Sequence, residues 1–193
     1  MTPHEINDKD NFIMGWRFED TTFCDAVVGH YETQTPSKGM VGNFVVIPEI
    51  KDSLEVALGW GPHTQLYFAH LQKCVDAYVE KYKYSNENAA WQVFEYVNIQ
   101  KYPIKGGYHK WHCERNGYTP MTNARHLAFM TYLNDVTDEG ETEFFYQKLK
   151  VTPEKGLTLI WPADWTFTHR GIPSPTQEKM IVTGWFNYKT PGV

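Results

Sequence analysis

The stretch Tyr102-Pro-Ile-Lys-Gly-Gly-Tyr-His-Lys-Trp-His-Cys-Glu114 ends in a histidine and a carboxylate two residues apart, His112 and Glu114. Residues two apart on an extended strand point to the same face, with Cα atoms about 6.7 Å apart, so both side chains can meet at one metal ion. A His-x-Glu pair is common by chance, and taken alone it also fits an ordinary surface or core position. The pair is therefore half of a candidate metal site, and the other half must come from elsewhere in the chain.

A second histidine follows near the C-terminus, in Trp161-Pro-Ala-Asp-Trp-Thr-Phe-Thr-His169-Arg-Gly. Two histidines and one carboxylate form the ligand set that leaves three coordination positions open, as in non-haem Fe(II) oxygenases. Neutral imidazole and carboxylate suit ferrous iron, and no thiolate is needed. We expect His112, Glu114 and His169 to lie at one mouth of a β-barrel and to act as the metal ligands and catalytic centre.

The composition favours one globular, β-rich domain. A chain of 193 residues suits a single domain over 1–193, and 16% aromatic residues favour a sheet-based core. The net charge of −5 gives no reason to expect nucleic acid or an anionic membrane as a partner. Three distant cysteines, no apolar run of spanning length and no leader-like N-terminus predict a cytoplasmic protein without a membrane segment.

The chain changes character at about residue 91. Helical support is expected over about 20–85, with a short helix from Asp20 to Val28 and a longer one from Thr64 to Lys83. Short strand-like runs separated by turn residues form the core over about 91–188. This order predicts a mainly β fold with supporting helices, a double-stranded β-helix or jelly roll. The expected strands are 91–102, 108–114, 125–134, 143–149, 157–161, 166–169 and 179–188.

The last predicted strand, Lys179-Met-Ile-Val-Thr-Gly-Trp-Phe, carries a lysine on an apolar face. With period-two alternation, Lys179, Ile181, Thr183 and Trp185 share one side of the strand. A buried ammonium without a partner is costly, and an anionic co-substrate would supply that partner. The alternative is that Lys179 lies just outside the barrel in water, and the strand alone does not separate the two.

The order of motifs resembles the prolyl-4-hydroxylase branch of the 2-oxoglutarate and Fe(II)-dependent oxygenases. The resemblance covers about residues 91–188, and its lysine lies ten residues after the distal histidine, as the family's basic residue does. Each motif alone is weak, whereas five in the same order are specific. They are His112-x-Glu114, Gly140-Glu-Thr-Glu-Phe144, Gly156-Leu-Thr-Leu-Ile-Trp-Pro162, His169, and Lys179 followed by Trp185.

The resemblance implies a role for each matching residue. It makes His112, Glu114 and His169 the iron ligands, and Lys179 the anchor of the far carboxylate of 2-oxoglutarate. Because lysine is a point charge without the bidentate geometry of arginine, it needs help. The resemblance assigns that help to Tyr132 and places Tyr102 at the iron-bound end of the co-substrate. The alternative for either tyrosine is a core ring with a satisfied hydroxyl.

Three positions depart from the family pattern. The usual aspartate ligand is Glu114, longer by one methylene, so the reach of the ligand changes. The tyrosine expected three residues before the first ligand is replaced by His109, with Tyr108 one position earlier. The Gly-Gly-Glu-Thr motif begins with Glu139, a change that we expect to alter only a turn.

The function implied by the resemblance is hydroxylation with Fe(II), 2-oxoglutarate and O2, giving succinate and CO2, with ascorbate as a further candidate cofactor. The first choice of substrate is a peptidyl proline or related residue, with Trp185 and Tyr108 as an aromatic wall for it. A small molecule or free amino acid is the alternative. An oxygenase of alkylated nucleobases is disfavoured by the acidic balance. A rival of another class is a non-catalytic, cupin-like metal-binding module, which would not require Lys179.

Overall fold

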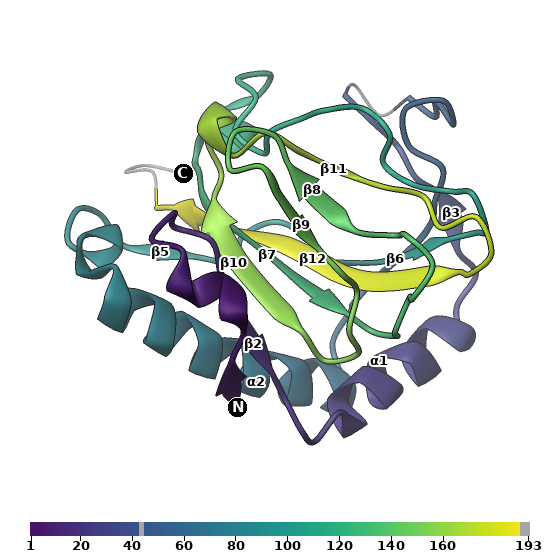
Figure 1. Cartoon of the computed structure of the whole chain (residues 1–193), viewed down its shortest axis with the longest axis horizontal. Helices are drawn as coiled ribbons and strands as arrows, with labels where there is room; N and C mark the ends of the chain where they lie inside the picture. Colours follow the sequence, from purple (N-terminus) through teal and green to yellow (C-terminus); the bar gives the residue numbers. More distant parts are fainter. Residues whose placement is uncertain (43–44, 190–193) are drawn as a thin grey trace.

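The computed structural model describes residues 1–42 and 45–189. Helices α1 (Thr22–Glu32) and α2 (Pro62–Lys81) lie side by side beneath the strands, which form two layers above them (Figure 1). Shorter helical segments are η1 (Glu5–Asp8), η2 (Lys83–Asn86), α3 (Pro120–Asn123) and η3 (Trp165–Phe167). The strands are β1 (Thr2–Pro3), β2 (Met14–Arg17), β3 (Ser37–Lys38), β4 (Leu54–Ala57), β5 (Trp91–Gln92), β6 (Asn98–Tyr102), β7 (Arg125–Tyr132), β8 (Thr142–Phe144), β9 (Leu149–Val151), β10 (Thr158–Pro162), β11 (His169–Gly171) and β12 (Lys179–Tyr188).

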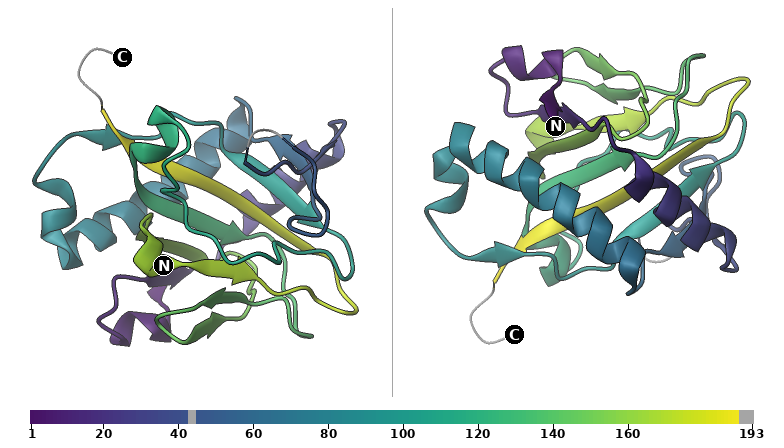
Figure 2. Two further views of the ribbon diagram at one scale, coloured as in Figure 1. Left: turned by 90° about the horizontal axis from the view of Figure 1, so that it is seen from above. Right: turned by 90° about the horizontal axis from the view of Figure 1, so that it is seen from below.

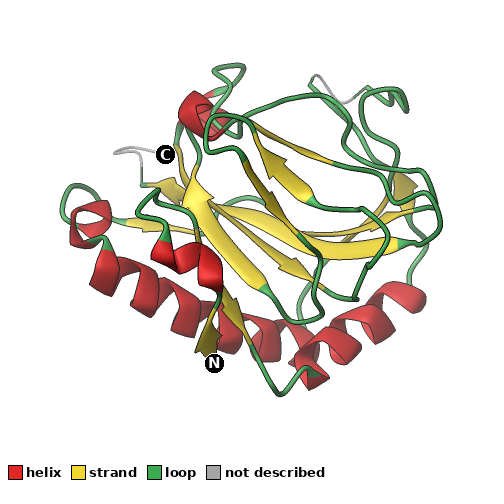
Figure 3. Cartoon of the chain, viewed as in Figure 1, coloured by secondary structure: helices red, strands yellow, loops and turns green. Residues whose placement is uncertain are grey.

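Two antiparallel sheets face one another. Within the described ranges, nine strands form the major sheet in the order β1-β2-β10-β7-β12-β6-β4-β3, with β5 paired to β12. Three strands form the minor sheet in the order β11-β8-β9. Figures 2 and 3 show both helices covering one face of the major sheet, with the minor sheet on the other side. This arrangement is the expected mainly β jelly roll. Among the described helices, none combines the length and the apolar character that crossing a membrane requires.

The core divides into two clusters, one on each face of the major sheet. Alternate side chains of β7 enter different clusters, as the period of a strand requires. Leu127 and Phe129 pack with the helices, whereas Met130 and Tyr132 pack between the sheets. Because β7 is buried on both faces, it is a nearly continuous apolar run. The space between the sheets is therefore a distinct interior, walled by the major sheet and the minor sheet.

Strand β12 fills its predicted range and shows the predicted alternation. Val182 and Phe186 pack on the helix side, whereas Ile181 and Trp185 belong to the cluster between the sheets. Lys179, two residues before Ile181, is buried on that same inner side. The alternative that placed Lys179 in water is wrong.

Several expected element boundaries differ from the structure. Helix α1 extends to Glu32, and Asp20 precedes it, accepting the Thr22 backbone N–H at 3.0 Å. The run 91–102 contains two strands, β5 and β6, and the run 143–149 contains the end of β8 and the start of β9. An irregular stretch over 93–97 and a turn over 145–148 interrupt residues whose composition favours strands, so composition alone does not set the ends of a strand.

Two corrections affect the site directly. Residues 108–114 do not form a regular strand; they make isolated bridges, from Tyr108 to Lys51 and from His112 to His169. Residues 165–167 form η3, so that β11 begins only at His169. The premise that His112 and Glu114 share a face of a strand therefore does not hold. What brings the two side chains together is the local course of an extended loop anchored on β11.

Candidate active site

Three side chains from distant parts of the chain converge at one end of the interior. Ligand atoms of His112, Glu114 and His169 all lie within 4.8 Å of one another. Glu114 Oε1 is 3.7 Å from His112 Nε2 and 3.3 Å from His169 Nε2. The backbones of His112 and His169 form a two-way bridge, with N–H to carbonyl distances of 3.0 and 2.9 Å. This bridge fixes the loop that carries two of the residues to the strand that carries the third.

Both histidines direct the same nitrogen toward Glu114. His112 Nδ1 lies 3.0 Å from the Lys110 carbonyl, and His169 Nδ1 lies 2.9 Å from the Phe167 carbonyl. A carbonyl oxygen only accepts hydrogen bonds, so Nδ1 carries a proton in each ring, and in the neutral form of the ring Nε2 keeps its lone pair. Backbone carbonyls that orient imidazole in this way are typical of metal-ligating histidines. The two free Nε2 atoms and one carboxylate oxygen form a donor set with the chemistry expected for Fe(II).

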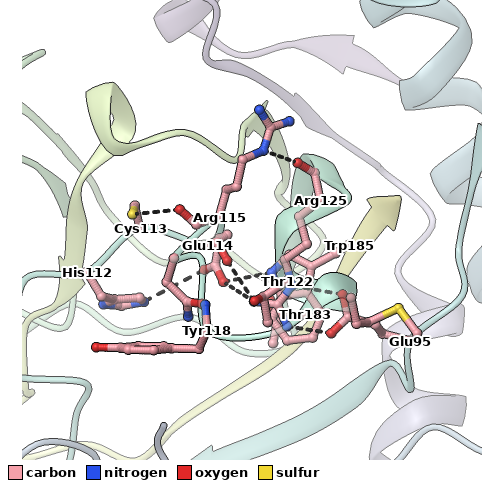
Figure 4. A network of polar contacts seen from close by, with 12 residues as sticks. Glu95, His112, Cys113, Glu114, Arg115, Tyr118, Thr122, Arg125, Thr183 and Trp185 are labelled. Atoms are coloured by element: carbon pink, nitrogen blue, oxygen red, sulfur yellow. Dashed lines mark hydrogen bonds and ion pairs between the residues drawn. The ribbon is translucent and has the colours of Figure 1, made fainter. Parts of the chain in front are cut away.

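Glu114 is held by contacts on its second oxygen. Trp185 Nε1 donates to Glu114 Oε2 at 2.7 Å, and an Arg125 guanidinium nitrogen donates to the same atom at 3.3 Å. Figure 4 shows Glu114 between His112 on one side and Arg125 and Trp185 on the other. Burial disfavours the charged carboxylate, but the surrounding polar groups, the Arg125 guanidinium among them, outweigh it and hold the pKa of Glu114 well below its usual range. The carboxylate is therefore ionised.

His112 is held in its neutral form. Burial, followed by the proximity of His169, lowers the pKa of His112 to about 3. The Tyr108 ring stacks on the imidazole, with centroids 3.7 Å apart and planes 14° apart. A neutral imidazole can coordinate a metal without first losing a proton.

Lys179 lies in the same interior, away from the carboxylate. It is only 4% exposed, and its ammonium donates to the Gly140 carbonyl at 2.6 Å and the Ile172 carbonyl at 3.3 Å. In the part of the chain that the structure describes, no carboxylate lies within ion-pair distance of it. Burial lowers the pKa of Lys179 to about 8, an effect that the charge of Glu141 partly opposes. The ammonium is therefore buried without a counter-ion.

The turn before β8 supplies one of these carbonyls. Glu139 and Gly140 both adopt left-handed backbone conformations, with φ of 56° and 84°. The non-glycine residue therefore occupies a conformation that glycine adopts more easily, at a cost of about 1 kcal/mol. The change from Gly to Glu at 139 leaves the turn in place, and the next carbonyl in the chain accepts from Lys179.

The two tyrosines assigned to the co-substrate are buried near Lys179. Tyr102 pairs with Lys179 in register, and the ammonium lies 5.3 Å from the centre of its ring. The Tyr102 hydroxyl donates to Gln100 Oε1 at 2.7 Å, and the Tyr132 hydroxyl lies 2.7 Å from Thr142 Oγ1. Both hydroxyls therefore have partners within the protein, and their predicted roles toward a co-substrate remain predictions.

Sequence reasoning missed the polar network behind Glu114. Arg125 makes two hydrogen bonds to Glu95, of 2.8 and 2.5 Å, and its guanidinium lies 3.6 Å from the centre of the Trp185 ring. Asn187 donates to the same Glu95 at 2.9 Å. One signal was present: an arginine opens the apolar run of β7, and a buried guanidinium needs partners. The sequence could not show that Glu95, thirty residues earlier, is one of them.

A large cavity of about 990 Å³ lies elsewhere, between α2 and the segment 91–97. The metal-ligand candidates do not line it. Of the residues that do, Glu95 is the one that also belongs to the network around Glu114. Cavity size alone would therefore direct attention away from the cluster with the strongest chemistry.

Comparisons with known proteins agree with this geometry. Residues 97–187 match the family model described as the 2OG-Fe(II) oxygenase superfamily. The match spans 91 of the 193 residues. The expected enzyme class, a 2-oxoglutarate- and Fe(II)-dependent dioxygenase, is thereby confirmed, and the family implies Fe(II) and 2-oxoglutarate. A search of curated proteins gives no match.

Solved structures of the same fold cover nearly the whole chain of this oxygenase. A viral collagen prolyl hydroxylase from Paramecium Bursaria Chlorella virus-1 matches with a TM-score of 0.69 and 19% identity, over 93% of this chain and 98% of its own. A prolyl-4-hydroxylase from Pseudomonas putida matches with a TM-score of 0.71 and 16% identity, over 94% of this chain and 96% of its own. A prolyl hydroxylase from Trichoplax adhaerens matches with a TM-score of 0.73 and 18% identity, over 95% of this chain and 86% of its own. That structure is a complex with a hypoxia inducible factor peptide fragment. At these identities the likeness establishes the double-stranded β-helix fold.

Proposed function

We propose that the protein is a 2-oxoglutarate-dependent hydroxylase that acts on a peptidyl proline or a related residue. In the reaction, substrate, 2-oxoglutarate and O2 give hydroxylated substrate, succinate and CO2. One oxygen atom of O2 enters the hydroxyl group and the other enters succinate. The observation that carries the proposal is the convergence of two imidazoles and one carboxylate in the same interior as a buried ammonium that no carboxylate of the described residues pairs with.

His112, Glu114 and His169 would hold the iron. The donor set fits because both imidazoles keep Nε2 free and the carboxylate is ionised at neutral pH. Bound iron supplies the activation of O2, which no side chain can provide. The protein's contribution is to hold the three donors in place and to leave the remaining coordination positions for small ligands.

Lys179 would bind the far carboxylate of 2-oxoglutarate. The Ile172 carbonyl contacts Lys179, and Ile172 lies three residues after His169 along extended chain. The two positions are therefore roughly 10 Å apart. A five-carbon dicarboxylate, with a contact at each end, spans such a separation. Tyr132 would support the same carboxylate, and Tyr102 would lie against the end nearer the iron. Two fixed ends would orient the co-substrate before substrate arrives.

The substrate side would be lined by Tyr108 and by the accessible part of Trp185, which suit a flat, weakly polar ring. Three solved structures of the same fold carry the name prolyl hydroxylase, and one includes a peptide, which supports a peptidyl proline as first choice. A small molecule or free amino acid remains the second candidate. The family match favours an enzyme over the non-catalytic cupin-like alternative.

The test is a succinate assay on protein loaded with Fe(II) under anaerobic conditions. After air, 2-oxoglutarate and ascorbate are supplied, proline-containing peptides and free amino acids are screened for stimulated succinate release. We expect a proline peptide to give one hydroxylated product per succinate, as counted by mass spectrometry. In Lys179→Ala, metal content should be unchanged and succinate release lost. Unchanged release in that variant would refute the co-substrate assignment, and stimulation only by free amino acids would favour the second candidate.

A further inference from the structure

We propose that Arg125, Glu95 and Trp185 are positioning residues that make a glutamate work as the iron ligand at 114. The proposal rests on the proposed function only in taking Glu114 as a ligand. Figure 4 shows the residues in a line, with Glu114 nearest His112 and Glu95 farthest from it. The inference concerns how the carboxylate is aimed, and its test is metal binding, which does not depend on turnover.

The two oxygens of Glu114 have different partners. Oε2 receives the Trp185 indole N–H at 2.7 Å and an Arg125 N–H at 3.3 Å. Oε1 faces the two histidine Nε2 atoms, at 3.7 and 3.3 Å. Because two donors occupy Oε2, the carboxylate presents one oxygen to the metal position. The network thereby favours binding through one oxygen, which leaves more coordination positions open for co-substrate and O2.

Arg125 is itself fixed from behind. Glu95 binds its guanidinium through two hydrogen bonds, and Asn187 holds Glu95 by donating to the oxygen that faces Arg125 Nε. A third donor interaction joins Arg125 to the Glu114 backbone carbonyl at 3.0 Å. A guanidinium whose nitrogens already donate to other groups loses little further conformational entropy when it binds a carboxylate. The orientation of Arg125 is therefore set before any metal arrives.

The length of the side chain explains why this support is needed. Glutamate has one more rotatable bond than the family's aspartate, so an unsupported Glu114 would sample positions away from the metal. An aspartate at 114 would retract its carboxylate by about 1.5 Å, too far to keep the Trp185 contact. The network thus matches a glutamate and would be of little use to an aspartate.

The charge balance also favours a cation. Arg125 carries one positive charge, and Glu114 and Glu95 carry one negative charge each, so the buried trio is left with one negative charge. A divalent cation would therefore enter a site with a net attraction that is not already neutralised.

The experiment measures the dissociation constant of Mn(II) by anaerobic calorimetry in Trp185→Phe, Glu95→Gln and Arg125→Lys. We expect each variant to bind Mn(II) about 10–100-fold more weakly than the unmodified protein. Trp185→Phe keeps an aromatic ring and removes the N–H together with the smaller ring of the indole, so it serves even if Arg125→Lys does not fold. The matched control is Arg170→Lys, because Arg170 pairs with Glu143 and lies 4.5 Å from the Trp111 ring, yet contacts no ligand. The control should bind Mn(II) normally.

A double-mutant cycle separates positioning from general loss of structure. In the Glu114→Asp background, Trp185→Phe should change the Mn(II) dissociation constant by less than about twofold, because the contact is already absent. The absorption spectrum of bound Co(II) should change in Trp185→Phe and stay unchanged in Arg170→Lys. Equal effects of Trp185→Phe in both backgrounds, or near-normal affinity in both Trp185→Phe and Glu95→Gln, would overturn the proposal. Normal Mn(II) affinity in His169→Ala would overturn the ligand set, and with it both proposals. If the network variants bind Mn(II) weakly but the unmodified protein hydroxylates no substrate, the proposed function alone is refuted.

Discussion

The two ends of the interior differ in whether the chain supplies a charged partner for the buried ionic side chain. At the metal end, Glu114 has hydrogen-bond donors on its second oxygen, and Arg125 behind it is paired with Glu95. At the other end, Lys179 is as deeply buried, yet its ammonium contacts two backbone carbonyls, and no carboxylate of the described residues reaches it. One end is assembled by the protein alone. The other lacks an anion.

This difference indicates what each end does. A buried ammonium without a counter-ion destabilises the fold, and a sequence under no functional demand would replace it with an apolar residue. An anion that binds there recovers the cost of burial as binding energy. If the proposed roles hold, the metal end would be preorganised for a cation, whereas the Lys179 end would be completed when a carboxylate arrives.

The largest effect is expected for His169→Ala at the metal end. The substitution removes one of three donors and leaves the backbone bridge between residues 112 and 169 in place. Affinity for Mn(II), measured by calorimetry, and iron content after dialysis should both fall by more than about 100-fold. His30→Ala, in α1, provides a histidine outside the site and should leave both unchanged. Normal metal content in dialysed His169→Ala would show that the three residues are not the ligand set.

At the other end, Lys179→Met should separate stability from binding. The pKa of Lys179 is lowered from 10.5 to about 8, which corresponds to at most about 3 kcal/mol of destabilisation. Removing the charge should therefore raise the free energy of unfolding at pH 7. Below pH 8 the ammonium is charged in both the folded and the unfolded protein, and the variant gains the full stabilisation. Between pH 8 and pH 10.5 the folded protein loses the proton and the unfolded chain keeps it, so the stabilisation fades and is gone above 10.5. Calorimetric binding of 2-oxoglutarate to the Mn(II)-loaded variant should be lost, with Mn(II) affinity retained.

An unchanged affinity for 2-oxoglutarate in Lys179→Met would remove the functional explanation of the buried charge. The stability of Lys179→Met at pH 7 provides a second test of the difference between the two ends. If it were less stable than the unmodified protein at pH 7, the contacts with the Gly140 and Ile172 carbonyls would outweigh the cost of burial. The Lys179 end would then be as self-sufficient as the metal end.

The sequence predicted the parts of the molecule that depend on local periodicity. Strand β12 has the predicted limits, and its alternation placed Lys179 beside Ile181 and Trp185. The same reasoning proposed a regular strand over 108–114, which the structure replaces with an extended loop. The residue types there are compatible with a strand, but the partner at His169 allows a single bridge. Partners far away in sequence decide such cases.

The network behind Glu114 was beyond prediction for the same reason. Its contacts join residues 95, 114, 125 and 185, which no periodicity links. Trp185 was expected in a wall for the substrate, and the structure shows its N–H engaged with a ligand candidate. A sequence reveals that a charged group on an apolar strand needs a partner. Only coordinates reveal whether the chain itself supplies that partner, as for Arg125, or does not, as for Lys179.

The pH dependence of co-substrate binding should sharpen the comparison. Because the pKa of Lys179 is about 8, the ammonium is charged below this pH and becomes neutral above it. The affinity of the Mn(II)-loaded protein for 2-oxoglutarate should therefore fall by about tenfold between pH 7 and pH 9. Lys179→Arg stays charged over this range and should show a flat profile, whatever its absolute affinity. A decline of equal steepness in both proteins would assign the titration to another group.

The smallest effect is expected for Tyr132→Phe, which removes the hydroxyl that contacts Thr142 Oγ1. The same hydroxyl also lies 3.2 Å from the Val151 carbonyl, and loss of its buried hydrogen bonding should lower the free energy of unfolding by about 1 kcal/mol. Tyr67→Phe is a matched control, because its hydroxyl contacts Thr131 on the helix side of the same strand at 3.1 Å. Both variants should lose similar stability and bind Mn(II) normally. Only Tyr132→Phe should weaken 2-oxoglutarate binding, by about three- to tenfold, the net value of a typical hydrogen bond. Equal 2-oxoglutarate affinity in the two variants would leave Tyr132 as a core residue and make Lys179 the sole side chain to which the far carboxylate is assigned.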